Sequence, residues 1–509
     1  MRLRPHLHPH PAELGLAILL VASFAVRLPF VRDTLHDDTF ISMRYAERLA
    51  QGAGLTFNDG ERVEGFTNFL WTILLAAADR LGLDLVAIVP WLSVIPALGL
   101  VYLVYRFGVR EGGLPARAWA LVAPLLVALH PFLLAESVGG LETTFFVALV
   151  FAGFDRAVAE RRSKARAGGA AALFALATLV RPEGTLAFAL LVAARLIGPG
   201  SEARARGVGR DLGIYVLLVL PLLCFRLGYY GDWVPNTFHA KVGWSTAQLE
   251  RGWRYLRDYG LALAPIPVLV LAAAGVGRGW RAVAAASVVT TAAYAVAVGG
   301  DFAPTGRFVL VAAPFVALLV QSAALGIAGW LTRRRLGIPT ALACVLVAAT
   351  WSLQAEAHRL ESRAWPASYR HDLEARRYLG RWFAATLPPD ATIAVGSIGA
   401  IGYYGQRRIL DTFGLTNVEI GRLQVEWMGR ASAGHEKGDA DVVLRAAPEV
   451  IVFDRAFLAP RRVDFEEFLA EARSPTEQLL AQDPRLYESY GLRSTPTPAG
   501  VLHWLERVP

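Results

Sequence analysis

The residues best suited to chemistry lie in one short stretch, from His36 to Tyr45, which begins His-Asp-Asp. Its two adjacent carboxylates, Asp37 and Asp38, come soon after the first hydrophobic segment. A carboxylate costs about 2.5 to 3.5 kcal/mol at the centre of a bilayer, so this pair must face water or a polar cavity. There it could accept the proton of a reacting hydroxyl. Asp37 and Asp38 are therefore the candidate catalytic residues, with capping of the following helix as the alternative role.

Composition places these residues in a membrane protein. Of the 509 residues, 54% are hydrophobic and only 18% are charged, and the mean hydropathy is +0.40. Soluble domains carry about 25% charged residues. The net charge of +8 comes from short basic clusters between apolar runs, as the positive-inside rule explains. We expect a multi-pass α-helical protein of a bacterial plasma membrane, with membrane lipids and not nucleic acid around it.

The apolar runs predict about eleven transmembrane helices. The run at 66–78 is shorter than the ~20 residues needed to cross, so we predict a re-entrant or interfacial segment there. With that segment left out, the basic clusters between the spans all fall on the cytoplasmic side; counted as a span, it would place them outside. The predicted spans lie near 14–30, 85–105, 118–135, 141–157, 168–181, 184–199, 211–229, 260–277, 282–299, 308–331 and 337–355.

Two domains follow from this pattern. Residues 1–355 form the membrane domain, with an external first loop at 32–84 that includes a short amphipathic helix on the membrane surface. Residues 356–509 read as a soluble extracytoplasmic α/β domain. Within it we predict strands at 392–395 and 450–453 and helices at 372–387 and 464–473.

Every polar cluster with chemical potential falls on the outer side, and the cytoplasmic loops lack Walker and dinucleotide-binding motifs. In order, the outer motifs resemble those of GT-C glycosyltransferases. They are most similar to the terminal arabinofuranosyltransferases of mycobacterial-type cell walls, which use decaprenyl-phosphoryl arabinofuranose. The resemblance rests on residues 37–44 (DDTFISMR), 64–68 (EGFTN), 140–143 (GLET), 181–184 (RPEG), 235–241 (PNTFHAK), 300–304 (GDFAP) and 434–437 (GHEK).

The resemblance implies transfer of a sugar, arabinofuranose or a related pentose, from a polyprenyl-phosphate donor to an envelope glycan or glycolipid outside the membrane. The alternatives are a GT-C transferase for mannose, aminoarabinose or galacturonic acid, and a polysaccharide transporter or flippase. A transporter would favour inverted repeats and charges buried at mid-membrane, neither of which the sequence shows.

Each step of that reaction has candidate residues. A leaving lipid phosphate needs fixed positive charge, for which Lys241, Arg307, Arg181 and His239 are candidates; their alternative is snorkelling to lipid headgroups. Sugar hydroxyls could bind the polar loop side chains, which could instead only shape the loops. The predicted substrate-binding set is Arg44, Glu64, Asn68, Glu142, Arg181, Asn236, His239, Lys241, Asp301, Arg307, His435 and Lys437.

Metal use and stereochemistry stay open at the level of sequence. Asp37, Asp38 and Asp301 could together hold Mg²⁺ or Mn²⁺ through oxygen ligands, although no spacing requires it. A single base suits inversion, whereas retention would need a nucleophile or front-face attack. His435 and Lys437 could reach over the site from the soluble domain or lie in a solvated loop.

Overall fold

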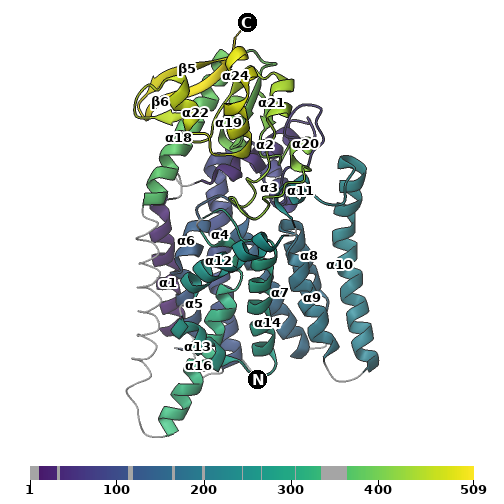
Figure 1. Cartoon of the computed structure of the whole chain (residues 1–509). Coiled ribbons are helices and arrows are strands. Elements are labelled where there is room, and N and C mark those ends of the chain that lie inside the picture. Colours follow the sequence, from purple (N-terminus) through teal and green to yellow (C-terminus); the bar gives the residue numbers. More distant parts are fainter. Residues whose placement is uncertain are drawn as a thin grey trace.

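A computed structural model describes residues 11–30, 35–112, 119–162, 167–197, 201–243, 245–264, 266–303, 305–333 and 364–508. It is a bundle of helices with a mixed α/β unit at one end (Figure 1). The predicted span at 337–355 and the predicted domain boundary at 355/356 lie outside the described residues.

Apolar helices of different lengths build the bundle. Among the described residues, three are long and apolar enough to cross a membrane alone: Leu85–Gly112, Arg206–Tyr230 and Trp280–Ala297. The helices up to residue 333 are α1 (Pro11–Arg27), η1 (Leu28–Phe30), α2 (Asp37–Ala50), α3 (Phe69–Arg80), α4 (Leu85–Gly112), η3 (Trp119–Leu121), α5 (Val122–Ala128), α6 (Pro131–Glu136), α7 (Thr143–Arg162), α8 (Gly169–Val180), α9 (Gly184–Leu196), α10 (Ser201–Tyr230), α11 (Asn236–Lys241), α12 (Thr246–Leu263), α13 (Ile266–Gly275), α14 (Trp280–Ala297), α15 (Arg307–Leu310) and α16 (Ala313–Arg333).

Two predicted spans are broken in the structure. The run at 118–135 divides between α5 and α6 at His130, whose extended backbone precedes Pro131. The run at 260–277 divides after Ala264, which is also extended and precedes a proline in the sequence. Thr246–Leu263 and Val268–Gly275 are bent by 85° there. A residue before proline is pushed out of the helical region, so these apolar runs cannot continue as single straight helices.

The α/β unit contains a six-stranded mixed sheet among the described residues. Its order is β2-β1-β3-β6-β4, with β5 paired to β6; β1 runs parallel to β2 and β3, and β6 is antiparallel to its neighbours. Its elements are α18 (Ala364–Thr386), β1 (Thr392–Val395), α19 (Ile398–Gly405), β2 (Arg408–Asp411), α20 (Val418–Gly421), α21 (Ala440–Ala446), β3 (Val450–Ile451), β4 (Leu458–Ala459), α22 (Phe465–Ala470), α23 (Pro475–Gln482), α24 (Pro484–Ser489), β5 (Tyr490–Thr497) and β6 (Gly500–Arg507).

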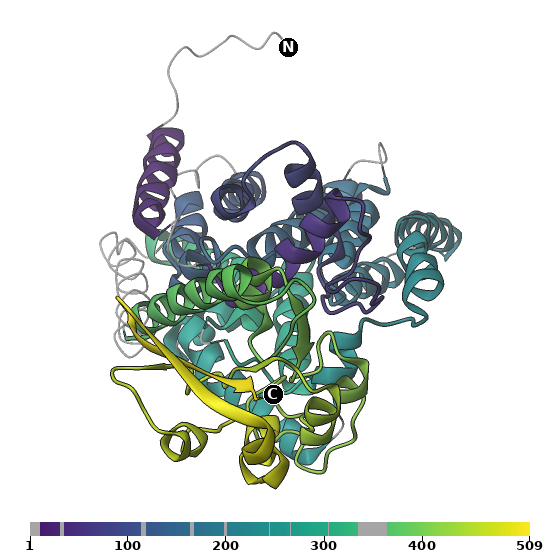
Figure 2. The ribbon, with the colours of Figure 1, turned by 90° about the horizontal axis from the view of Figure 1, so that it is seen from above.

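The first loop and the α/β unit share one hydrophobic core. Tyr45 and Phe57 from the loop pack in the same buried cluster as Ile393 and Ile398 from the sheet and α19. Helix α2 contacts both α3 and α19, and its side chains from Thr39 to Ala46 are buried. It is therefore enclosed by protein on two sides, where the sequence predicted a helix lying on the membrane. From above, α18 (green) lies beside α2 (purple) over the helices (Figure 2).

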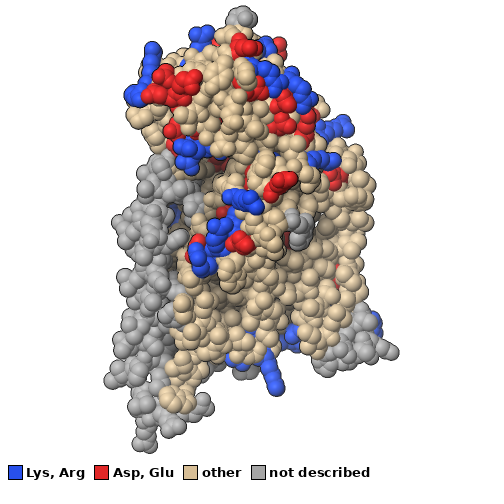
Figure 3. Space-filling view, in the orientation of Figure 1, with Lys and Arg blue, Asp and Glu red and all other residues tan. Residues whose placement is uncertain are grey.

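Charged side chains separate along the long axis of the molecule. They gather over the α/β unit and at its boundary with the bundle, while the surface of the bundle below is mostly uncharged (Figure 3). Lys and Arg side chains return at the lower edge. This distribution fits a bundle whose middle faces lipid and whose ends face water.

Candidate active site

A cavity of about 1050 Å³ lies between the bundle and the α/β unit. Ligand sites usually have volumes of about 300 to 1,000 Å³, so this cavity has room for a sugar and part of an acceptor. From the first loop and the bundle, Asp38 and Arg307 line it; from the α/β unit, Arg376, Trp427 and His435 do so. Residues far apart in the sequence therefore form one polar chamber at the end of the bundle.

The two adjacent aspartates have different surroundings. The Asp37 carboxylate is buried and accepts hydrogen bonds from the backbone N–H groups of Gly399 and Ala400, at 3.1 and 2.9 Å. These groups begin α19, so Asp37 caps a helix of the α/β unit. Burial raises the pKa of Asp37 to about 6, against the opposing effect of the Arg376 guanidinium. The predicted alternative was capping of a helix that starts at Thr39. In the structure that helix, α2, already includes Asp37, and the helix start that Asp37 binds is that of α19 in the α/β unit.

Asp38 faces the cavity. Its side chain is 30% exposed, and Oδ2 lies 4.0 Å from Nη1 of Arg307. Among the described residues its carboxylate accepts no hydrogen bond from the protein, so both oxygens are available to a bound hydroxyl. Of the predicted pair, Asp38 has the position of a base and Asp37 has that of a structural anchor.

The raised pKa of Asp37 gives a testable pH dependence. The unfolded carboxyl has an ordinary pKa of 3.8, and the folded one a pKa of about 6, so between these values the folded protein binds more protons. The free energy of unfolding therefore falls as pH rises through this window, and the loss is constant above it. Relative to Asp37→Asn, which carries no such group, the wild type is expected to lose about 2 kcal/mol between pH 4 and pH 7. Melting midpoints of both proteins across this range measure it; a difference that does not change with pH contradicts it.

Arg307 and Asp301 form the buried ion pair of the cavity floor. The Arg307 guanidinium contacts both oxygens of Asp301, with Nη2 at 2.9 Å from Oδ1. Gly306 precedes Arg307 with φ of +59°, a conformation that suits glycine. Burial acts to raise the pKa of Asp301, but the Arg307 charge outweighs it and holds that pKa below its usual value. Asp301 is thus a carboxylate that fixes Arg307 beside Asp38.

Lys241 supplies a further positive charge beside His435, although Lys241 itself does not line the large cavity. The Lys241 side chain passes Gly434 so closely that a Cβ there would lie 3.1 Å from its Cγ. Lys241 makes no hydrogen bond or ion pair with the part of the chain that the structure describes. His435 is held between the rings of Phe302 and Phe413. Burial and the charge of Lys241 lower the pKa of His435. It is therefore a neutral cavity wall, and not the solvated loop residue that the sequence also allowed.

A second polar network lies beside Arg307. Arg181 pairs with Glu142 at 2.7 Å and with Glu183 at 2.6 Å, and Asn68 donates to Glu142 at 2.7 Å. A small cavity of about 50 Å³ beside Arg181 and Arg307 is lined by apolar side chains of α7 and α9 and by four hydroxyl-bearing residues of α14: Ser287, Thr290, Thr291 and Tyr294. The predicted residues Asn68, Glu142 and Arg181 are thus brought together beside this passage.

Two other predicted residues connect the two parts of the chain. The Arg44 guanidinium donates to the carbonyl oxygens of Phe57 and Arg407, at 2.8 and 2.7 Å. The Asn236 amide donates to the carbonyl oxygen of Gly414 at 2.8 Å. Both side chains are buried and neither lines the large cavity. Their positions correspond to fixing the fold and not to binding sugar hydroxyls.

The remaining predicted residues are also bound within the protein. Glu64 forms a buried two-point ion pair with Arg226, at 2.8 and 2.9 Å. His239 contacts Asp232 at 2.9 Å. The Lys437 ammonium donates to the carbonyl oxygen of His239 at 3.0 Å. Lys437 is therefore buried in the protein and is not the solvated loop residue that the sequence also allowed. None of these residues lines the large cavity.

The three aspartates proposed for a metal do not come together as a ligand set. Within the described ranges, no group of three or more acidic, histidine or cysteine residues is arranged to hold an ion. Asp37 is bound to backbone N–H groups and Asp301 to Arg307, so only Asp38 has unengaged oxygens. The residues present do not fit the predicted Mg²⁺ or Mn²⁺ site.

Sequence reasoning missed the groups behind the acidic pair. Tyr369 accepts a hydrogen bond from the backbone N–H of Asp37 at 2.7 Å, and Arg376 lines the cavity. Both lie on α18. The sequence predicts a helix in this region, but it does not show that the helix packs against the acidic pair. The buried Glu136 carboxyl lies 3.8 Å from His36, without a hydrogen-bond partner among the described residues. The sequence predicts that Glu136 lies in an outer loop, but no sequence pattern indicates that it lies near His36.

Comparison with known proteins adds independent evidence. The chain is 28% identical over 422 residues to a terminal β-(1→2)-arabinofuranosyltransferase of Corynebacterium glutamicum, covering 71% of this chain and 57% of the relative. It is 30% identical over 247 residues to a protein of the same name from Mycobacterium tuberculosis, covering 45% and 38%. The chain thus spans less than two thirds of either relative. Residues 365–494 match a family described as Domain of unknown function (DUF8728).

Two crystal structures of ArnT from Cupriavidus metallidurans share the fold across nearly the whole chain. The apo structure has a TM-score of 0.56 at 13% identity, covering 97% of this chain and 98% of ArnT. The structure bound to undecaprenyl phosphate has a TM-score of 0.58 at 12% identity, covering 96% and 98%. These likenesses agree with the predicted resemblance: the chain is a multi-pass membrane protein with the GT-C fold.

Proposed function

We propose that this protein is a glycosyltransferase that moves a sugar, arabinofuranose or a related pentose, from a polyprenyl-phosphate donor to a cell-envelope glycan at the outer face of the plasma membrane. The observation that carries this proposal is Asp38, an available carboxylate in a large cavity at the end of a membrane bundle, with a fixed guanidinium 4.0 Å away. A base beside a fixed cation is what a displacement at an anomeric carbon requires, because the attacking hydroxyl loses a proton and a phosphate anion leaves.

Asp38 acts as the base in this scheme. Its carboxylate accepts the proton of the acceptor hydroxyl as that oxygen forms a bond to the anomeric carbon. The bond between the anomeric carbon and the donor phosphate oxygen breaks, and its electron pair leaves with the lipid phosphate. Positioned proton transfer of this kind contributes about 10² to 10⁴-fold in rate.

Arg307 and Lys241 receive the leaving phosphate. Arg307 is held in place by Asp301, so its remaining guanidinium edge is fixed before substrate arrives. Lys241 has no partner among the described residues, which leaves its three donors for phosphate oxygens. The passage between α7, α9 and α14 begins beside Arg307, and its apolar side chains from α7 and α9 suit the first isoprenoid units of such a lipid. The likeness to ArnT bound to undecaprenyl phosphate supports a donor of this class.

The acceptor glycan enters through the part of the cavity walled by the α/β unit. Trp427 is 43% exposed there, and an indole face is a common platform for a sugar ring. Arg430 and Gln478 line the same wall with exposed polar groups suited to hydroxyls. This arrangement puts donor and acceptor on opposite sides of Asp38.

Transfer from synthetic lipid donors tests the proposal. Purified full-length protein is given polyprenyl-phosphoryl arabinofuranose, mannose, galacturonic acid or aminoarabinose with an arabinan oligosaccharide or a glycolipid as acceptor. The expected result is a product from the arabinofuranosyl donor, at least about tenfold above each other donor, since a site built for one set of hydroxyls rejects others strongly. Transfer from a different donor retains the enzyme class and overturns the sugar. No transfer from any lipid donor, by protein that still binds polyprenyl phosphate, overturns the glycosyltransferase activity.

A further inference from the structure

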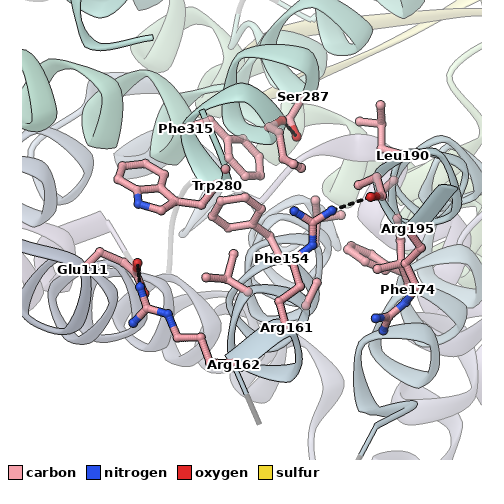
Figure 4. A pocket seen from close by; sticks show the side chains of 18 residues that line it. Glu111, Phe154, Arg161, Arg162, Phe174, Leu190, Arg195, Trp280, Ser287 and Phe315 are labelled. Carbon is pink, nitrogen blue, oxygen red and sulfur yellow. Dashed lines mark hydrogen bonds and ion pairs between the residues drawn. The ribbon is translucent and has the colours of Figure 1, made fainter. Parts of the chain in front are cut away.

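A second cavity lies at the opposite end of the bundle from Asp38. It has a volume of about 230 Å³, is partly open to the outside, and is lined mainly by α7, α9, α14 and the start of α16. Its walls are apolar, with Phe154, Phe174, Trp280 and Phe315 facing the space (Figure 4). The basic clusters of this end place it on the cytoplasmic side by the positive-inside rule. No residue that we assign to proton transfer or to phosphate binding lines this cavity.

Three arginines line this apolar space, and they differ in charge compensation. Arg162 pairs with Glu111 at 2.5 Å, and Arg195 pairs with Glu160 at 2.7 Å. Arg161 has no carboxylate partner among the described residues, and its guanidinium contacts only the carbonyl oxygen of Ala194. In Figure 4 the Arg161 side chain reaches into the cavity between Phe154 and Leu190. Among the residues that the structure describes, the pocket therefore joins a positive charge without a carboxylate partner to apolar walls.

We propose that this cavity binds an anionic phospholipid of the inner leaflet, with its phosphate on Arg161 and an acyl chain between α7, α9 and α14. Basic pockets between membrane helices on the cytoplasmic side bind anionic headgroups because a guanidinium gains charge-assisted hydrogen bonds from phosphate oxygens. Within the described ranges, Arg161 has no such acceptor. The apolar walls match the acyl chain that the headgroup carries.

The far end of a donor isoprenoid chain is the competing occupant. The 230 Å³ cavity shares Val150, Ala187 and Leu190 with the smaller passage that begins at Arg307, so a long chain could continue into it. That chain ends in hydrocarbon, which offers nothing to a guanidinium and would displace water from it. A headgroup phosphate satisfies the charge, so Arg161 favours the phospholipid.

Native mass spectrometry of the delipidated full-length protein tests the site. Phosphatidylglycerol and phosphatidylcholine with identical acyl chains are titrated separately, and polyprenyl phosphate is the third ligand. We expect the wild type to bind phosphatidylglycerol about fivefold more tightly than phosphatidylcholine. Arg161→Gln should lose this preference. Arg278→Gln is the matched control, because it removes an exposed arginine at the same end that does not line the cavity.

Filling the cavity provides the second readout. Ala157 lines the space, and Ala157→Phe should weaken binding of both phospholipids, whereas Ala273→Phe on an exposed face of α13 should not. Retained preference in Arg161→Gln, or an equal loss in both arginine variants, overturns the proposal in favour of diffuse surface charge. If Ala157→Phe weakens only polyprenyl phosphate binding, the cavity belongs to the donor chain and the proposal is wrong. If Ala157→Phe fails to fold, the two arginine variants still decide.

Discussion

Asp38→Asn is expected to lower kcat for sugar transfer by about 10² to 10⁴-fold, the usual contribution of a positioned base. The asparagine keeps the size of the side chain and cannot accept the hydroxyl proton. Because Arg307 is held by Asp301 and not by Asp38, binding of the lipid phosphate should change little. Initial rates with a saturating lipid donor, together with the affinity for polyprenyl phosphate, separate the two effects.

Asp37→Asn is the matched control for this experiment. It makes the same chemical change one residue away, but at a carboxylate bound to the start of α19. We expect its effect to appear in stability, with a smaller loss of kcat. Equal loss of kcat in both folded variants would mean that the acidic pair acts as a unit. Full activity in Asp38→Asn would remove Asp38 from the reaction and leave Asp301 as the next candidate carboxylate.

Arg226→Met is expected to lower the free energy of unfolding by about 3 to 5 kcal/mol, because it leaves Glu64 buried without its partner. Glu64 and Arg226 are 2% and 6% exposed, and their two-point contact joins the first loop to α10. Burial already raises the pKa of Glu64 while Arg226 opposes it. The loss should therefore be larger at pH 8 than at pH 5, where Glu64 can take up a proton. Melting in detergent at both pH values measures it.

An exposed ion pair of the same loop is the control. Arg408 contacts Glu61 at 2.7 Å, and these side chains are 47% and 33% exposed. Arg408→Met should cost no more than about 1 kcal/mol, as is typical of surface pairs. If Arg226→Met costs as little as Arg408→Met, water reaches Glu64 and the loop is not fixed to α10 by this pair.

Sequence patterns predicted several of the elements correctly. The short apolar run at 66–78 is a helix of 12 residues, α3, and the buried strand predicted at 392–395 is β1. Such patterns depend on the spacing of apolar and charged residues along a short stretch of chain, so they can be recognised without knowing how the chain folds. Arg307 lies 4.0 Å from Asp38, and Lys241 is near enough to Asp301 for its charge to lower the pKa of that carboxyl.

Sequence patterns could not predict which residue of a motif faces the cavity and which one holds the fold together. Asp37 and Asp38 are identical residues in adjacent positions, and only the arrival of α19, more than 350 residues later, distinguishes them. Arg44 and Asn236 have the donors of binding residues, but carbonyl groups of the α/β unit occupy those donors. Contacts between distant segments depend on how the elements pack, and a single sequence holds no signal for that pairing.

The cap that Asp37 provides for α19 has a consequence for exchanging parts between relatives. Consider a hybrid protein that receives residues 364–508 from a relative. The start of its α19 would need a carboxylate at position 37 of the first loop to accept the hydrogen bonds of its backbone N–H groups. The transferred segment would also have to place backbone carbonyl groups where the side chains of Arg44 and Asn236 donate their hydrogen bonds. Grafts are therefore expected to succeed only when the first loop and the C-terminal unit are transferred together. Inheritance of the two segments should be linked, although most of the membrane bundle separates them in the gene.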